Sequence, residues 1–348
     1  MLKASFKKYQ LNFKTPSGTS RGVLSFKESW FIFVYNIYEP NIIGIGECGL
    51  LKGLSYDDVE NYEDILQEAC DNINSISLEE LSTYPSIRFG VEMALLDLKN
   101  KGSKQLFDTA FTQGNASIKI NGLIWMGSKE QMFEQIESKI LQGFRCVKLK
   151  IGAIDFEKEI SLLKYIRTHF NKDDIELRVD ANGAFSVDDA LNKLQRLSEF
   201  DLHSIEQPIK AKQWKAMAEL CQTTPLPIAL DEELIGVNEL SEKVKLLDTI
   251  QPQYIILKPS LVGGFAATQE WITLAKQKNI PWWITSALES NIGLSAIAQF
   301  TSTLNTNMYQ GLGTGQLYTN NFDCPLELQG ENLWYSSTKA WDLHLLNE

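Results

Sequence analysis

The feature that most constrains this chain is the regular recurrence of an acidic residue at the end of a short apolar stretch. An extended run at residues 175–179 ends at Asp180, and a glycine turn follows it. Glu206 ends a similar run 26 positions later, and Asp231 ends a third run 25 positions after that. Three acids at the ends of three regularly spaced strands predict an oxygen-rich site for a hard cation.

From about residue 116 the sequence alternates between predicted strands and predicted amphipathic helices. The predicted strands cover residues 118–125, 146–151, 176–180, 203–206, 227–231, 254–258, 282–285 and 308–311. Eight strands, repeating at roughly 25–30 residues, are what a closed parallel barrel requires. An open doubly wound sheet uses the same elements, but it gives no reason for a ligand at nearly every strand end. We therefore predict an α/β barrel over residues 116–315.

The segments on either side of this barrel have a different pattern. Up to about residue 50 the chain is rich in aromatic and β-branched residues, which predicts strands with loops at 15–22 and 46–56. Residues 57–102 are predicted to be helical, so residues 1–115 form an α+β domain. The tail, residues 316–348, returns to aromatic-rich extended segments and is predicted to rejoin that domain.

Composition narrows the classes of function. The net charge of −11 argues against a nucleic-acid backbone or an anionic membrane as the main partner. The five cysteines are scattered without a CxxC pair, and the amino terminus lacks the apolar run of a signal peptide. No stretch of about 18 apolar residues occurs, so we expect a cytoplasmic protein. With only three histidines, the chemistry is expected to depend on carboxylates and lysines.

Three lysines lie near the predicted acidic site. Lys148 and Lys150 share one face of the second predicted barrel strand, because side chains alternate along a strand. Lys258 ends the sixth strand, which lies opposite the second in a ring of eight. The three acids occupy the arc between these strands. The geometry predicts a pocket with a lysine on either side and a metal on one wall.

This arrangement suits removal of a proton next to a carboxylate. A divalent cation that chelates the carboxylate oxygens stabilises the negative charge as it develops. A lysine must be neutral to act as a base, and we expect Lys148 and the cation to lower the pKa of Lys150. Taken alone, a Lys-x-Lys pair usually lies on a solvent-exposed face, and an aspartate at a strand end is often a helix cap. Together, six ionisable groups at five consecutive strand ends favour catalysis.

These residues resemble the enolase superfamily, and within it the muconate-lactonizing subgroup. The downstream motifs are most similar to the family of o-succinylbenzoate synthases in that subgroup. These motifs are LKPSLVGG at 257–264, TSALESN at 285–291 and GLGTGQLYTN at 311–320. The resemblance implies a modified TIM barrel, (β/α)7β, with an α+β capping domain built from the amino-terminal part and the tail.

The resemblance also implies roles for the site residues. Asp180, Glu206 and Asp231 would bind Mg²⁺, with Mn²⁺ as an alternative ion. Lys150 would be the base, Lys258 would face the other side of the substrate, and Lys148 would tune Lys150. The implied reaction is a dehydration in menaquinone biosynthesis. It converts 2-succinyl-6-hydroxy-2,4-cyclohexadiene-1-carboxylate to 2-succinylbenzoate through a metal-stabilised enediolate, and the protonated base then helps hydroxide to leave as water.

Further residues are expected around the substrate. The loops at 19–21 and 53–56 should close over the pocket, and Arg21 is a candidate partner for the succinyl carboxylate. Ser286, Gly313 and Thr314 are candidates for polar contacts to the same arm, although ordinary loop chemistry explains them equally well. Asn182 and Glu232 are expected to support neighbouring ligands and not to bind the ion themselves.

Two alternatives stay open. An N-succinylamino acid racemase or dipeptide epimerase of the same superfamily would use Lys150 and Lys258 as opposed acid and base. Dipeptide epimerases usually carry an Asp-x-Asp pair where this chain has Gly313-Thr314-Gly315, which weakens that alternative. The other alternative is a non-catalytic metal-binding barrel. A small-molecule carboxylate is the expected ligand in the enzymatic readings, and a homo-oligomer is compatible with all of them.

Overall fold

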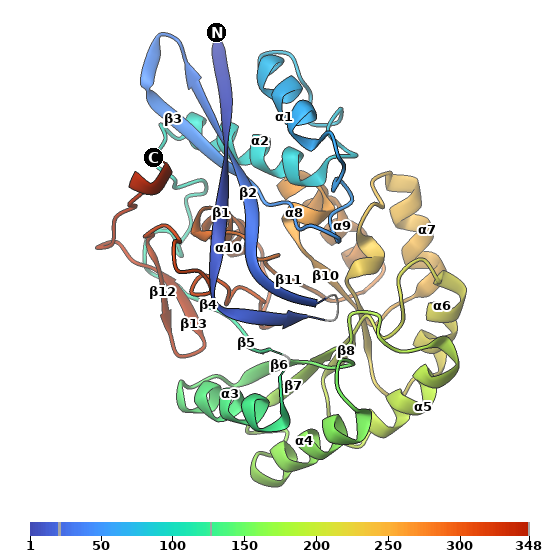
Figure 1. Ribbon diagram of the computed structural model, residues 1–348. Helices are drawn as coiled ribbons and strands as arrows, with labels where there is room; N and C mark the ends of the chain where they lie inside the picture. Colours follow the sequence, from blue (N-terminus) through green and yellow to red (C-terminus); the bar gives the residue numbers. More distant parts are fainter. Residues whose placement is uncertain (20–21, 126, 347–348) are drawn as a thin grey trace.

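The amino-terminal part of the chain forms an antiparallel sheet with two helices on one of its faces. The computed structural model describes residues 1–19, 22–125 and 127–346 (Figure 1). The sheet has the strand order β1-β2-β3. The bounds of its elements are β1 Leu2–Thr19, β2 Gly22–Asn36, β3 Glu39–Cys48, α1 Tyr62–Asp71 and α2 Pro85–Lys99. We call these five elements, with the segments that connect them, the capping layer.

Strand β2 contributes to two cores because its side chains alternate between the two faces of the sheet. Trp30 and Ile32 pack with the buried residues of α1 and α2, whereas Phe31 belongs to the core that includes the barrel. The approach of α2 to β3 is so close that a methyl group at Gly46 would overlap the carbonyl oxygen of Gly90. The antiparallel sheet is therefore packed tightly between α1 and α2 on one face and the barrel on the other.

Seven parallel strands form the second sheet, in which each strand lies next to the one before it in the chain. Their bounds are β5 Gly122–Ile124, β6 Cys146–Lys150, β7 Glu176–Asp180, β8 Ser204–Glu206, β9 Ile228–Leu230, β10 Tyr254–Leu257 and β11 Trp282–Ile284. Residues 310–311 close the ring, since Gln310 bridges to Ile120 and Gly311 bridges to Thr285, both in parallel. This closed ring confirms the predicted modified barrel.

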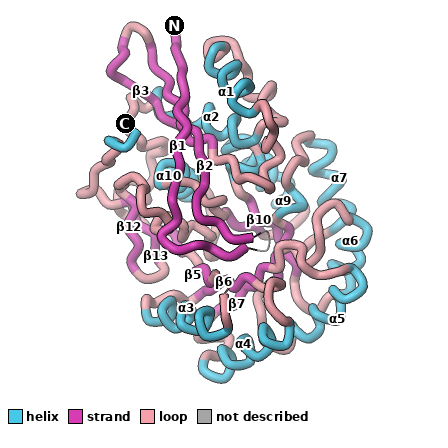
Figure 2. The backbone as a smooth tube through the Cα atoms, in the orientation of Figure 1, coloured by secondary structure: helices cyan, strands magenta, loops and turns pink. Residues whose placement is uncertain are grey.

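Helices follow the barrel strands and lie on the outside of the sheet (Figures 1 and 2). Their bounds are α3 Lys129–Leu141, α4 Phe156–His169, α5 Val187–Ser198, α6 Trp214–Thr223, η1 Glu232–Leu234, α7 Leu240–Ile250, α8 Pro259–Val262, α9 Gly264–Gln277 and α10 Asn291–Ser302. In α5 the Ser186 side chain accepts a hydrogen bond from the Asp189 amide and caps the first turn. Ala190, Leu194 and Leu197 are its buried side chains. The amphipathic pattern thus buries one stripe of this helix.

The carboxy-terminal segment contacts both the capping layer and the start of the barrel. It forms a small antiparallel sheet of order β12-β13-β4. The bounds are β12 Leu326–Gln329, β13 Asn332–Tyr335, β4 Ile118–Lys119 and the short helix η2 His344–Leu346. The Lys14 amide donates to the Leu317 carbonyl oxygen at 2.8 Å, and Phe13 bridges to Tyr318. We keep the division of the chain at residues 115 and 315 as a proposal.

Some predicted loops and strands are wrong in detail. Most of the predicted loop at 15–22 is the end of the β1-β2 hairpin, where Ser17 pairs with Leu24. In the second predicted loop, 46–56, the first three residues belong to β3 and pair with β2. Turn-forming residues adopt strand conformation where a neighbouring strand satisfies their backbone hydrogen bonds. The first predicted barrel strand, 118–125, is divided between β4 and β5.

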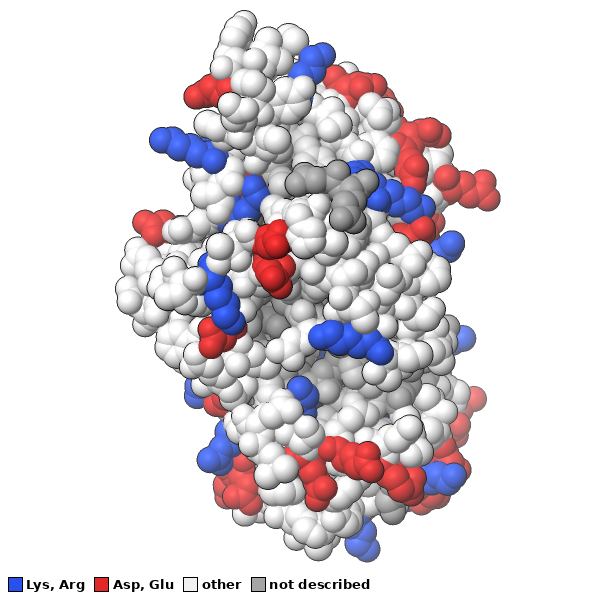
Figure 3. Space-filling model, turned by 60° about the vertical axis from the view of Figure 1, so that its left-hand side comes forward, with Lys and Arg blue, Asp and Glu red and all other residues white. Residues whose placement is uncertain are grey.

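Basic and acidic side chains are interspersed on the face of the molecule in Figure 3. This face therefore lacks the single-sign basic stripe that is typical of nucleic-acid binding. Within the described residues, no helix has the length and apolar character needed to cross a bilayer.

Candidate active site

Six ionisable side chains from five neighbouring strands meet inside the barrel mouth. In the sheet register, Lys150 pairs with Asp180, and Asp180 pairs with Glu206, across β6, β7 and β8. The other members come from β6 itself and from the residues that directly follow β9 and β10. The six residues are Lys148, Lys150, Asp180, Glu206, Asp231 and Lys258, and together we call them the charged row. The structure thus brings together the three predicted acids and the three predicted lysines.

In space, four of these charges alternate in sign, in the order Lys150, Asp180, Lys148 and Glu206. Lys150 Nζ lies 2.9 Å from Asp180 Oδ2, and Lys148 Nζ lies 3.4 Å from the same oxygen. Lys148 Nζ also lies 2.6 Å from Glu206 Oε2. One ammonium group therefore bridges the carboxylates of two adjacent strands.

The row continues with a second bridging lysine. Lys258 Nζ pairs with Asp231 Oδ2 and lies 3.8 Å from Glu206 Oε1. Burial disfavours the charged form of Lys258, but the attraction of Asp231 and Glu206 outweighs it and raises the pKa of this lysine. Each pair of neighbouring acids consequently holds one positive charge between them.

The centre of the row is almost inaccessible to water. Only 6% of Lys148 and 1% each of Asp180 and Glu206 are exposed. Burial opposes the charge of Lys148, yet Glu206 and Asp180 together raise its pKa. Burial opposes the charge of Asp180 as well, but Lys150, Lys148 and Lys258 hold the pKa of that carboxyl well below its usual range.

Asn182 orients the ammonium group of Lys150. Its Oδ1 atom accepts a hydrogen bond from Lys150 Nζ at 2.7 Å, and its Nδ2 donates to Glu232 Oε1 at 3.0 Å. The Asn182 amide donates to Asp180 Oδ1 at 3.0 Å, within a turn that gives Asn182 a φ of 44°. Asparagine tolerates this left-handed conformation better than most residues. Asn182 and Glu232 thus lie beside the charged row, at the place predicted for them from the sequence.

A cavity of about 110 Å³ adjoins the row. Lys148, Lys150 and Lys258 line it from the barrel, while Leu24 of β2 and Lys52 of the segment after β3 line it from the capping layer. These two capping residues also line a groove of about 590 Å³ beside β2 and α1. The site is therefore enclosed jointly by the barrel and the capping layer and adjoins a larger groove.

The loop after β11 forms a polar wall of the cavity. Ser286 Oγ lies 2.8 Å from Thr314 Oγ1, and it donates to the Gly311 carbonyl oxygen at 3.1 Å. Ser286, Gly313 and Thr314 all line the cavity that contains the catalytic lysine candidates. The three residues predicted from the downstream motifs are thus brought to the site.

Comparison with known proteins identifies the family. The family model described as "Enolase C-terminal domain-like" matches residues 131–334, more than half of the chain. The chain belongs to the enolase superfamily. An o-succinylbenzoate synthase from Desulfotalea psychrophila is 46% identical over 94% of this chain and 98% of that protein. The crystal structure of MenC from Desulfotalea psychrophila LSv54 superposes with a TM-score of 0.85, at 43% identity, covering 96% of this chain and 99% of that chain.

A more distant relative carries a different name. An N-succinylamino acid racemase from Amycolatopsis sp is 25% identical over 83% of this chain and 80% of that protein. Enolase-superfamily enzymes depend on divalent metal ions and commonly use a lysine or histidine base. The lysines and carboxylates of the charged row in this chain agree with that chemistry.

The donor atoms of the site fit such a cation. Carboxylate oxygens are the ligands that Mg²⁺ prefers, and the buried Glu206 Oε1 atom makes no hydrogen bond. Across the described ranges, no three acidic, histidine or cysteine side chains already converge on one point. Instead, Lys148 lies between Asp180 and Glu206, and Lys258 lies between Glu206 and Asp231. Each neighbouring pair of acids thus already shares one cationic group.

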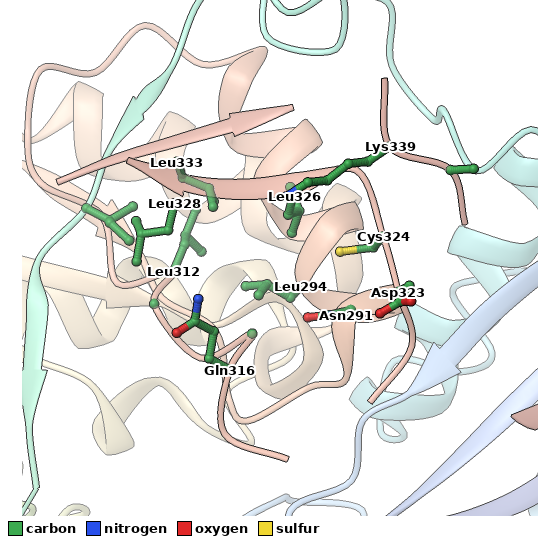
Figure 4. A pocket seen from close by; sticks show the side chains of 14 residues that line it. Asn291, Leu294, Leu312, Gln316, Asp323, Cys324, Leu326, Leu328, Leu333 and Lys339 are labelled. Atoms are coloured by element: carbon green, nitrogen blue, oxygen red, sulfur yellow. The ribbon is translucent and has the colours of Figure 1, made fainter. Parts of the chain in front are cut away.

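A separate cavity of about 500 Å³ lies between the tail and the barrel (Figure 4). Leucines such as Leu294 and Leu312 line it together with polar side chains, among them Asn291, Gln316 and Asp323. It contains none of the six charged residues, although it shares Gly313 with the smaller catalytic cavity. We assign the chemistry to the smaller cavity because the reactive groups are there.

Sequence reasoning missed several residues of the site. Asn121 and Trp125 flank the first barrel strand and line the cavity, as do Leu24, Leu51 and Lys52 of the capping layer. The position of Trp125 at the end of the predicted strand 118–125 is a usable signal, whereas Asn121 lies in the middle of that predicted strand. No local pattern marks the capping residues, because their place depends on how two separate sheets pack. Arg21, the predicted partner of the succinyl carboxylate, lies outside the described residues.

Proposed function

We propose that this protein is an o-succinylbenzoate synthase, a hydro-lyase that converts 2-succinyl-6-hydroxy-2,4-cyclohexadiene-1-carboxylate to 2-succinylbenzoate in menaquinone biosynthesis. The observation that carries the proposal is the row of alternating lysines and acids at the barrel mouth. It supplies a base and a fixed positive charge on the wall of one enclosed cavity, with the acids that would hold a metal beside them. The o-succinylbenzoate synthase from Desulfotalea psychrophila, similar over nearly its full length, supports this choice of substrate.

Lys150 is the proposed base. Its Nζ atom lines the cavity and is held by hydrogen bonds to Asp180 Oδ2 and Asn182 Oδ1. After losing a proton to solvent, this nitrogen accepts the α-proton of the substrate. The same nitrogen then returns a proton to the departing hydroxyl group, which leaves as water from the same face. One well-oriented amine therefore serves both steps.

Lys258 and Lys148 have supporting roles. Lys258 holds its positive charge next to Glu206 and Asp231 and lines the cavity, so it stabilises negative charge as it develops on the substrate. Lys148 lies behind Lys150, bonded to Asp180 and Glu206. Through Asp180, which also bonds to Lys150 Nζ, it fixes the surroundings of that base.

Asp180, Glu206 and Asp231 are the residues that would hold a divalent cation, for which we propose Mg²⁺ with Mn²⁺ as an alternative. When bound, such an ion supplies positive charge beside the carboxylate oxygens of the substrate as the α-proton leaves. Asn182 and Glu232 keep the neighbouring side chains in place through their mutual hydrogen bond.

The succinyl arm of the substrate requires a partner for its terminal carboxylate. Lys52 lines the cavity from the capping layer, and Ser286 and Thr314 offer hydroxyl groups from the barrel side. We propose Lys52 as a cationic partner, beside the earlier candidate Arg21. Closure of the capping layer over this arm would also exclude water from the reaction.

An N-succinylamino acid racemase is the second candidate, because it uses the same base and the Amycolatopsis relative carries that name. A dipeptide epimerase is less well supported, since Gly313, Thr314 and Gly315 offer no carboxylate for a substrate amine. We also propose a cytoplasmic location.

The test is direct measurement of 2-succinylbenzoate formation with and without EDTA, alongside α-proton exchange of N-succinylamino acids in D₂O. We expect fast product formation that EDTA abolishes and added Mg²⁺ restores. Full activity after complete metal removal would refute the role of the three acids. Rapid exchange without dehydration would favour the racemase.

A further inference from the structure

A buried network of charged side chains joins the capping layer to the barrel at a distance from the proposed chemistry. Its first member, Glu47 of β3, is fully buried and reaches the start of α10. Glu47 Oε1 accepts from the Ser290 amide at 2.9 Å, and Oε2 accepts from the Gly293 amide at 2.9 Å. Ser290 Oγ also donates to Glu47 Oε2. A carboxylate of the capping layer thus takes up the free amide groups of a barrel helix.

A buried lysine neutralises part of this charge. Lys27 of β2 is 4% exposed, and its Nζ atom donates to Ser29 Oγ at 2.7 Å. Ser29 Oγ donates in turn to Glu47 Oε1 at 2.8 Å, and Lys27 Nζ lies 3.9 Å from the same oxygen. The network therefore ties the position of β2 to that of α10.

Glu289, also fully buried, extends the network to the walls of the catalytic cavity. Its Oε2 atom accepts from the Ala287 amide at 2.6 Å, and its Oε1 atom accepts from Ser260 Oγ. Ser260 lies two positions after Lys258, and Ala287 and Leu288 line the cavity. One carboxylate consequently connects the segment that follows β10 with the loop that follows β11.

The segments joined by this network both contribute to the lining of the cavity. Leu24 lies on β2, three residues before Lys27, and Leu288 lies directly before Glu289. Both leucines line the cavity, and both pack against an apolar cluster that includes Tyr318. Leu288 has a φ of 64°, an uncommon conformation for leucine, and its carbonyl oxygen accepts from the Tyr318 hydroxyl at 2.6 Å. Its backbone is thus held in a strained conformation by its surroundings.

We propose that Glu47 and Glu289 are positioning residues that set the separation between the capping layer and the loop after β11, and thereby the fit of the substrate's succinyl arm. This inference rests on the proposed function. Buried charged pairs are weak sources of stability compared with apolar packing. Their value here is geometric: directional hydrogen bonds fix two rigid layers in one relative position, which apolar contacts alone do not do.

The discriminating variant is Glu47→Gln. A glutamine keeps the shape of the side chain but turns one acceptor into an amide nitrogen, which cannot accept from Gly293 or Ser290. The matched control is Asp97→Asn in α2. Asp97 is also fully buried and accepts from two backbone amides, those of Ile45 and Lys104, but both partners lie outside the cavity. Both variants therefore lose a buried carboxylate, but only Glu47→Gln weakens a direct hydrogen bond to α10.

We expect Glu47→Gln to raise KM for the cyclohexadiene substrate by about tenfold while kcat stays within about threefold, because the base and the acids are on barrel strands. Asp97→Asn should leave KM within about twofold at a temperature at which both variants are folded. If Glu47→Gln does not fold, Ser29→Ala provides a milder change that removes one hydrogen bond to Glu47. An unchanged KM in the folded Glu47 or Ser29 variant would overturn the proposal.

Hydrogen–deuterium exchange separates this proposal from the proposed function. Faster exchange of the amides of residues 287–293 is expected in Glu47→Gln and not in Asp97→Asn, with no substrate present. If the unmodified protein fails to convert the substrate, the function is wrong and the exchange measurement still tests the link between the layers. Unchanged exchange in Glu47→Gln would contradict that link even in an active enzyme.

Discussion

Replacing Lys148 with methionine removes a buried ammonium group that Asp180 and Glu206 share. Loss of one partner from a buried ion pair costs about 3–5 kcal/mol, because the remaining charge stays buried without compensation. An unfolding entropy of about 2.1 cal/mol/K per residue corresponds to about 0.7 kcal/mol/K for the 348 residues. We therefore expect the melting temperature of Lys148→Met in EDTA to fall by about 4–7 °C.

The same structure predicts how this loss responds to metal. A divalent cation between the carboxylates of Asp180 and Glu206 supplies the charge that the lysine no longer provides. Added Mg²⁺ should therefore raise the melting temperature of Lys148→Met more than that of the unmodified protein. Thermal unfolding followed by circular dichroism, in EDTA and across a Mg²⁺ series, measures both effects.

Lys243→Met is the matched control for this experiment. Lys243 is also buried, but it pairs with Glu270, a partly exposed acid on α9 that is not part of the charged row. We expect a smaller loss of stability and no additional response to Mg²⁺. If Lys148→Met melts at the unmodified temperature in EDTA, or if its response to Mg²⁺ equals that of Lys243→Met, the reasoning about shared charge is refuted.

Two further outcomes are expected. Lys52→Gln should raise KM for the proposed substrate by about tenfold, whereas Lys99→Gln, on the exposed side of α2, should not; equal values from steady-state kinetics would remove Lys52 from the site. Burial raises the pKa of Glu159 from 4.5 to about 7, so the proton that it holds stabilises the native state fully below pH 4.5, and this contribution is lost as the pH rises through 7. Glu159→Gln should flatten the decline of the unfolding free energy over that range, by up to about 3 kcal/mol, in urea titrations; an unchanged pH profile would contradict this.

The charged row of the site was predictable because it depends on strand geometry alone. The period of two along a strand places Lys148 and Lys150 on one face, and the carboxyl ends of parallel strands meet at one edge. Acids at regular spacing therefore had to lie side by side, as the pairing of Asp180 with Glu206 shows. The barrel itself followed from the alternation of strands and helices.

The walls of the cavity were less predictable because they depend on contacts between distant segments. Leu24 and Lys52 reach the site through the packing of the capping layer, which no local pattern encodes. Strands β1 and β2 extend into a glycine- and serine-rich stretch that local propensity assigned to a loop. Likewise, the positions of Glu47 and Glu289 along the chain do not indicate that Glu47 bonds to the start of α10 or that Glu289 bonds to Ser260.

The roles of the individual lysines require direct measurement. Lys150→Ala tests the central claim, that the Lys150 amine takes the α-proton while the acids hold the ion. We expect product formation to fall by about 10³-fold, whereas Mg²⁺ binding measured by calorimetry is retained, because the three acids remain and one of the two ammonium groups beside Asp180 Oδ2 is removed. Turnover within tenfold of the unmodified rate, or loss of Mg²⁺ binding together with activity, would contradict the account.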